Sequence, residues 1–213
     1  KEMTMIYVVT SGRQFGSGGR VIGKLVAEAL GIDYYDKELM IEAAKSHGVD
    51  AQLFENADEK APSFFSGLSS IGLGLGLGGG AFFPGQAGSG YDSIYQMQSE
   101  VIENLASRGS CVIVGRTADF ILRHHENVIS IFIHASMDDC VKRIMERHET
   151  ETVDHARSLA EKRNKIRAAY YNFYTDKEWG NAASYDLCIN SSKMSVEEVA
   201  AVITNYVKAR LGL

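Results

Sequence analysis

A glycine-rich run with an arginine at its end is the segment of this sequence best suited to chemistry. It reads GRQFGSGGR over residues 12–20 and joins a short apolar segment to an amphipathic one. Small residues let successive backbone N–H groups converge on an anion, and the N-terminus of a following helix adds to the attraction. A phosphate chain is the ligand that suits this geometry best. Its placement between a strand and a helix favours phosphate binding over a plain glycine-rich turn.

The run departs from the standard phosphate-binding pattern G-x-x-x-x-G-K-[ST] at the lysine. Aligned on its G-x-G, the sequence has Gly19 where lysine is expected; with one extra glycine allowed, Arg20 takes the lysine's role. A guanidinium can hold phosphate oxygens through two hydrogen bonds. The hydroxyl that helps to hold magnesium is missing after Arg20, and Ser17 or Ser11 would replace it. The residues predicted to bind the nucleotide are Gly16, Ser17, Gly18, Gly19, Arg20 and Val21.

The elements that must position this loop alternate between short apolar segments and longer amphipathic ones. Predicted strands cover residues 5–10, 32–35, 111–115, 128–134 and 185–190. Predicted helices cover residues 20–30, 36–47, 91–108, 136–149, 152–174 and 195–211. This alternation predicts an α/β protein with a five-stranded parallel sheet between layers of helices, a three-layer P-loop NTPase-type fold. Ligands of such sheets bind beyond the carboxyl ends of the strands, where the glycine run also lies.

Residues 62–90 interrupt the alternation with a glycine-rich stretch. It contains ten glycines and both prolines of the chain, and its most regular part is GLGLGLGGG over residues 72–80. Such a segment cannot offset its ordering entropy by burial, which predicts a flexible insertion. We expect a single domain over residues 1–213 that carries this insertion.

Composition excludes several classes of protein. The formal charge of −5 and the pI near 5.7 argue against a protein that coats polymeric nucleic acid. No apolar run approaches the roughly 20 residues of a membrane helix, and the first residues lack a signal-peptide core. Cys111, Cys140 and Cys188 have no metal-ligand or disulfide spacing, which suits a reducing cytoplasm. We therefore expect a cytoplasmic protein without a membrane partner, and the sequence leaves a homo-oligomer open.

Several segments resemble the cytidylate kinase-like family, which lies within the P-loop nucleoside monophosphate kinases. They are GSGGRVIGKLVAEALGIDYYDKELM at residues 16–40, VIVGRTAD at 112–119, RAAYY at 167–171, YTDKEWG at 174–180 and YDLCINS at 185–191. The arginine form of the glycine run is also that family's form. The resemblance covers about residues 5–210. It implies a nucleotide kinase-like domain that uses ATP and Mg²⁺ to phosphorylate a nucleoside monophosphate, CMP or dCMP first.

Arginines are the candidates for phosphoryl transfer, because this reaction needs positioned positive charge more than acid–base chemistry. Arg116 directly follows a predicted strand, and the resemblance implies that it contacts the acceptor nucleotide. Arg163 and Arg167 are four residues apart and share one face of a predicted helix with Tyr170 and Tyr174. The resemblance implies a helical lid at about residues 150–180 that closes over phosphates. The alternative for this face is a solvated surface with salt bridges.

Asp36 ends the second predicted strand and resembles an acidic residue of the cytidylate kinases. It could hold Mg²⁺ through water, accept a proton from the acceptor or cap the following helix. Glu42 stands where an arginine is expected in proven cytidylate kinases, so a kinase for another small acceptor stays open. The missing lysine and hydroxyl leave open an ATP-binding regulatory protein with little turnover.

Overall fold

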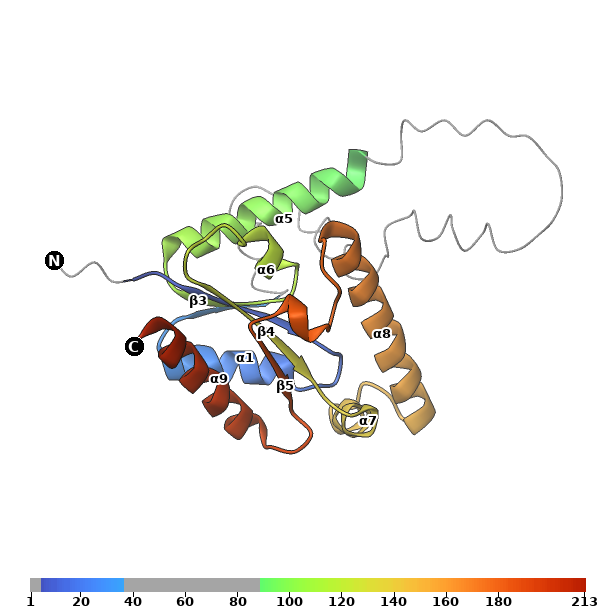
Figure 1. Cartoon of the computed structure of the whole chain (residues 1–213). Coiled ribbons are helices and arrows are strands. Elements are labelled where there is room, and N and C mark those ends of the chain that lie inside the picture. The colour runs from blue at the N-terminus through green and yellow to red at the C-terminus, as the bar shows by residue number, and fades with distance from the viewer. Residues whose placement is uncertain (1–4, 37–88) are drawn as a thin grey trace, which may run out of the picture.

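A parallel sheet organises the computed structural model, which describes residues 5–36 and 89–213 (Figure 1). Its five strands are β1 (Val8–Arg13), β2 (Asp33–Tyr35), β3 (Cys111–Val114), β4 (Val128–His134) and β5 (Leu187–Asn190). They lie in the order β2-β3-β1-β4-β5, and every neighbouring pair is parallel. Because β1 is central, its carboxyl end opens in the middle of the edge where ligands of such sheets bind. The predicted α/β class and five-stranded parallel sheet are confirmed.

Helices cover both faces of the sheet and complete the three layers (Figure 1). One face carries α1 (Gly19–Leu30) and α9 (Val196–Leu211), and the other carries α5 (Ser89–Arg108) and α6 (Ala118–Ile121). Val9 of β1 is buried with the first pair of helices, whereas its neighbour Val8 is buried with the second. Burial on both faces explains why the strands are apolar without interruption.

Two further helices lie beside the carboxyl ends of the strands, α7 (Met137–Glu146) and α8 (Val153–Tyr174) (Figure 1). They pack on each other through a small apolar cluster that contains Val141, Ile144, Ala156 and Ala160. Ser136 and Thr152 cap the two helices by accepting hydrogen bonds from the backbone N–H groups of Asp139 and His155. The packing of α7 on α8 holds α8 beside the carboxyl edge of the sheet (Figure 1).

Several predicted boundaries shift in the structure. β1 runs to Arg13, beyond the predicted residue 10, because Gly12 and Arg13 still pair with the long strand β4. The connecting loop is thus limited to residues 14–18. α5 begins at Ser89, so the last two residues of the predicted insertion are helical; residues 62–88 and the predicted helix after Asp36 lie outside the described residues.

Other local predictions can be compared directly. The sequence SVEE at residues 195–198 is typical of a capping box, and Ser195 and Glu198 form one at the start of α9. α6 and the 3₁₀ turn Ala182–Ser184 were not predicted, because elements of three or four residues carry no readable periodicity. Within the described part of the chain, none of the helices has the length and apolarity needed to cross a membrane.

Candidate phosphate-binding site

The loop between β1 and α1 leaves the N-terminus of α1 open. Gly18 is the N-cap residue with φ of 80° and provides no side-chain cap, and the first turn contains no acidic residue. The first N–H groups of a helix have no partner inside the helix and carry partial positive charge. This end of α1 is therefore suited to an anion.

Gly16 brings the loop into contact with α7. Its φ is +82°, and a Cβ atom at this position would lie 2.8 Å from both the Cβ atom and the carbonyl oxygen of Cys140. A side chain would thus meet a strained backbone and a close contact at once. The tight turn depends on glycine here.

Neighbouring elements hold the loop through hydrogen bonds. The backbone N–H of Gln14 donates to the carbonyl of Ile133 at 3.0 Å, and its side-chain oxygen accepts from the N–H of Ala135 at 3.1 Å. The N–H of Phe15 donates to Asn164 Oδ1 of α8 at 2.7 Å. The loop is therefore attached both to the end of β4 and to α8.

A second chain of contacts supports the loop from below. Ser191, directly after β5, donates its hydroxyl to the carbonyl of Ser17 at 2.7 Å. Arg143 of α7 donates to the hydroxyl of Ser191 at 3.1 Å and to its carbonyl at 2.7 Å. Arg147, which follows α7, forms an ion pair with Glu149 at 2.7 Å. Arg143, in contrast, is a positioning residue for the loop.

A cavity of about 400 Å³ opens over the loop. Loop residues, Asp36 after β2 and side chains from α8 and the end of α7 line it. The arginines among these lining residues are Arg13, Arg20, Arg147, Arg163 and Arg167. This concentration of guanidinium groups around an open helix N-terminus suits a polyphosphate.

Arg20 and Asp36 form an ion pair at the rim of this cavity. Arg20 Nε lies 2.9 Å from Asp36 Oδ2, and the Arg20 side chain is 65% exposed whereas that of Asp36 is 8% exposed. The hydroxyl of Tyr34 also donates to Asp36 at 3.4 Å. Burial, followed by the charge of Asp36, raises the pKa of Tyr34 to about 12, so its hydroxyl stays protonated. A phosphate contact by Arg20 stays a prediction.

Arg116 lies at a smaller cavity of about 60 Å³ at the carboxyl ends of β1 and β3. Arg116 is buried. It is the second of three consecutive residues with positive φ, which is 87° at Gly115, 60° at Arg116 and 54° at Thr117. Left-handed residues other than glycine are uncommon and strained, and such strain concentrates at functional sites. The sequence predicted a functional position for Arg116, and the structure places it at a cavity next to the loop.

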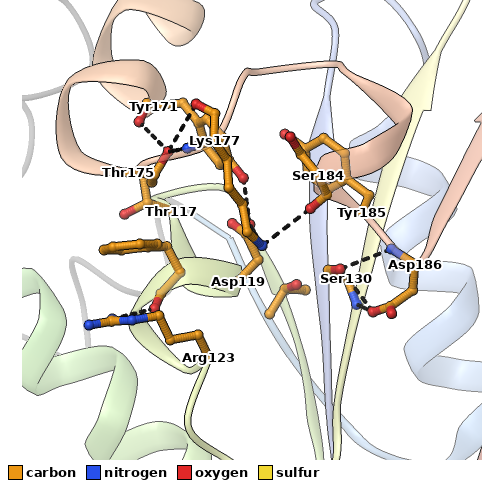
Figure 2. A network of polar contacts seen from close by, with 12 residues as sticks. Thr117, Asp119, Arg123, Ser130, Tyr171, Thr175, Lys177, Ser184, Tyr185 and Asp186 are labelled. Carbon is orange, nitrogen blue, oxygen red and sulfur yellow. Dashed lines mark hydrogen bonds and ion pairs between the residues drawn. The ribbon is translucent and has the colours of Figure 1, made fainter.

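The buried carboxylate of Asp119 also lines this smaller cavity, and Figure 2 shows the polar network around it. Asp119 accepts a hydrogen bond from the hydroxyl of Tyr171 at 2.7 Å and lies 3.7 Å from Lys177 Nζ, which also donates to the carbonyl of Ser184 at 3.3 Å. Burial raises the pKa of Asp119, and Tyr171 and Lys177 counteract this shift. Burial, followed by the charge of this carboxylate, raises the pKa of Tyr171.

The polar stripe predicted on α8 divides between two neighbours. Arg163 and Arg167 line the larger cavity, and the guanidinium of Arg167 donates to the carbonyl of Arg13 at 3.1 Å. Tyr170 donates to Gln98 of α5 at 2.9 Å, and the ring of Tyr174 stacks on Tyr95 of α5 at 4.0 Å. The arginines thus face the loop while the tyrosines attach α8 to α5.

The model of the cytidylate kinase-like family matches residues 8–193. This chain belongs to the cytidylate kinase-like family. A cytidylate kinase from Methanosarcina barkeri is 23% identical over 197 residues, which span 92% of this chain and 94% of that protein. A cytidylate kinase from Methanococcus aeolicus is 26% identical over 201 residues, with the same two shares covered.

Solved structures confirm the P-loop kinase fold of this family member. An uncharacterized protein from Eubacterium ventriosum is 29% identical, with a TM-score of 0.68, and the match covers 95% of this chain and 98% of that one. Shikimate kinase from Bacteroides thetaiotaomicron is 13% identical, with a TM-score of 0.55 and 98% and 100% of the two chains covered. The second likeness shows a shared fold alone.

The residues predicted to hold magnesium fit it unequally. Asp36 lines the larger cavity with a carboxylate, the kind of ligand that Mg²⁺ takes beside substrate phosphates. Ser17 is fully buried, and its hydroxyl donates to the carbonyl of Gln14 at 2.9 Å. A metal role for Ser17 stays a prediction that would require this bond to be exchanged. Among the described residues, no three His, Cys, Asp or Glu side chains gather into a metal site.

Sequence reasoning on this cytidylate kinase-like chain missed several residues that support the loop. Ser191 could have been suspected, because it follows a strand at the ligand-binding edge. Asn164 and Arg143 gave no such indication, since each is one of many polar residues on a helix. Arg13 was included in the glycine run without a role of its own.

Proposed function

We propose that this chain transfers the γ-phosphoryl group of ATP to a nucleoside monophosphate, with CMP or dCMP as the first candidates. The observation that supports it is the pair of adjoining cavities. The larger one surrounds the phosphate-binding loop, the smaller one contains Arg116, and Arg13 and Arg167 line both. Membership of the cytidylate kinase-like family, and the names of its archaeal relatives, favour a cytidine nucleotide as acceptor.

In this proposal the loop and α8 act on the donor. The N–H groups at the start of α1 hold the β- and γ-phosphates, and Arg163 and Arg167 neutralise charge on the transferred group. Arg116 holds the phosphate of the acceptor. An oxygen of that phosphate attacks the γ-phosphorus, and the bond from this phosphorus to the bridging oxygen of ADP breaks. The acceptor oxygen is already ionised near neutral pH, so the transfer needs no general base.

Mg²⁺ would fit beside Asp36. When bound, the ion would supply positive charge that neutralises the negative charge developing on the phosphates. Asp36 would hold it directly or through water, and the ion pair with Arg20 would keep the carboxylate in place.

An ADP-release assay with CMP, dCMP, UMP, AMP and GMP as acceptors tests the proposal. We expect turnover with CMP or dCMP, and a loss of about 100-fold or more in kcat/KM for the acceptor in Arg116→Ala, as for other removed charge-stabilising groups. Arg123→Ala is the matched control, because Arg123 is exposed and lies over the ring of Phe120. Since Arg116 is buried, thermal unfolding and the Arg116→Lys variant separate lost function from lost folding.

The other outcomes of this assay identify the alternatives. ATP binding without turnover on any acceptor would favour a regulatory nucleotide-binding protein. Turnover only with a sugar or another small alcohol would favour a different acceptor. If the protein neither bound ATP nor turned over any acceptor, the proposal would be rejected.

A further inference from the structure

A side chain at residue 19, the position of the standard lysine, would overlap with the side chain of Arg13. Gly19 stands where the pattern has lysine. A Cβ atom at Gly19 would lie 2.7 Å from the Cβ atom of Arg13 and 3.0 Å from its Cγ atom. These atoms are the stem of Arg13 beside its backbone, so they cannot swing away as the end of a flexible side chain could. A side chain at residue 19 and the Arg13 side chain therefore exclude each other.

Arg13 is anchored at both ends of its side chain. Its backbone is the last pair of β1, opposite Ile133, and its carbonyl accepts from Arg167 at 3.1 Å. Its guanidinium lies against Gly115 at the end of β3, where an added Cβ would contact Nη1 and lie 3.1 Å from Cζ. The side chain thus reaches from the start of α1 to the end of β3, and it lines both cavities.

Arg20 occupies a different position. Its guanidinium is engaged with Asp36 and its side chain is 65% exposed, at the rim of the larger cavity. Arg13, in contrast, passes directly over the first helical residue, Gly19, at the boundary between the two cavities. Of these two arginines, Arg13 has the position from which one cation can contact a donor phosphate and an acceptor phosphate together.

We infer that Arg13 is the cation that replaces the phosphate-binding lysine, and that Gly19 is small because Arg13 takes its space. The inference rests on the proposed function, since it names the group that contacts the transferred phosphoryl. A guanidinium presents two parallel donors, so Arg13 can hold oxygens of the donor and the acceptor at once, whereas a lysine acts as a point charge. The standard motif has glycine at its first position and lysine at its seventh. This sequence has arginine at the first position, Arg13, and glycine at the seventh, Gly19.

Restoring the standard motif tests this inference. Arg13→Gly should lower kcat/KM for ATP by about 100-fold or more. Gly19→Lys alone should be similarly impaired, because Arg13 blocks the new side chain. The double variant Arg13→Gly/Gly19→Lys should regain at least about tenfold over either single variant, since the new lysine supplies the charge. Glycine is required at residue 13, because an alanine would keep the Cβ atom 2.7 Å from the new one.

Controls separate this inference from folding and from the proposed function. Lys24→Ala removes an exposed cation of α1 that lies outside both cavities, and its kinetics should not change. If Arg13→Gly does not fold, Arg13→Lys serves instead, with a loss of about tenfold expected because a point charge replaces two donors. The ratio of ATP to AMP affinity should fall in the Arg13 variants, whereas a merely structural defect would weaken both nucleotides alike.

Two results would overturn the inference while leaving the kinase proposal intact. One is a folded Arg13→Gly variant with the kinetics of the unmodified protein. The other is a folded double variant that is no more active than the single variants. If the unmodified protein neither binds ATP nor turns over any acceptor, the proposed function itself fails. That failure is seen without any substitution at Arg13, so it is distinct from the two results above.

Discussion

At the scale of the residue, Gly16 is the position where the loop has least freedom. It combines φ of +82° with a potential contact of 2.8 Å to the backbone of Cys140. Gly31, the C-cap of α1, has φ of +65° but nothing within 4 Å of an added Cβ. The two glycines therefore separate backbone strain from steric contact.

Gly16→Ala should lower the free energy of unfolding by about 3 kcal/mol, and Gly31→Ala by about 1 kcal/mol, because only the first adds a clash to the strain. Urea unfolding of the two variants measures both values. Gly16→Ala should also weaken ATP binding, since the loop must move away from α7, whereas Gly31→Ala should not. Equal destabilisation of the two variants would contradict the contact with Cys140.

Asp119 makes a pH-dependent contribution of predictable sign. Burial raises the pKa of Asp119 above its ordinary value of 3.8, so ionising it costs more in the folded chain than in the unfolded chain. Its favourable contribution is complete below this value and is lost as pH rises through the folded pKa. The difference in free energy of unfolding, Asp119→Asn minus unmodified protein, should therefore increase as the pH rises above about 4.

Urea unfolding at several pH values measures this difference. Asp176→Asn, at an exposed carboxylate after α8, is the control for removing one carboxylate outside the buried network. A difference for Asp119→Asn that stays constant or falls with pH would contradict the assigned shift.

At the scale of the element, side chains of α8 hold the backbone at the end of β1 and in the phosphate-binding loop through hydrogen bonds. Asn164 accepts from the N–H of Phe15 at 2.7 Å, and Arg167 donates to the carbonyl of Arg13 at 3.1 Å. Asn164→Ala should raise KM for ATP by about fivefold to tenfold, since one hydrogen bond contributes about 1 kcal/mol. Lys165→Ala, at the next and exposed residue of α8, should leave KM unchanged. Equal KM values for both variants would show that the bond does not position the loop.

The elements themselves were largely predictable, and the misses have physical causes. The apolar run of β4 predicted its bounds correctly because both faces are buried. β1 was predicted to end before Gly12, because glycine weakens a strand, yet β4 continues far enough to pair with Gly12 and Arg13. Periodicity placed Arg163 and Arg167 on one face of α8, but it could not show that Tyr174 of that face stacks on Tyr95 of α5.

At the scale of the whole molecule, the site was predictable as far as the glycine run and the strand end at Arg116. Both follow from the rule that ligands bind at the carboxyl edge of a parallel sheet. The role of Arg13 was not predictable, because it depends on the distance between its stem and Gly19, two positions that a motif aligns but does not place in space. Sequence patterns indicate which residues lie at the carboxyl edge of the sheet. Only the packing shows which of their side chains would occupy the same space.

The shared lining of the two cavities leads to a prediction about ligands. Arg13 and Arg167 border both cavities, so a molecule that joins adenosine and cytidine through a chain of phosphates should occupy them together. Linking two binding groups makes the second contact intramolecular, so this molecule should bind at least about tenfold more tightly than ATP. Calorimetric titration measures both affinities.

Arg167→Ala provides the informative comparison in this titration, because Arg167 borders both cavities whereas Arg163 borders only the larger one. The substitution should reduce affinity for the linked molecule more than affinity for ATP, and Arg163→Ala should reduce both by similar factors. If the linked molecule bound no more tightly than ATP, the two cavities would not be parts of one site. In that case the proposed role of Arg116, holding the phosphate of an acceptor bound next to ATP, would be wrong.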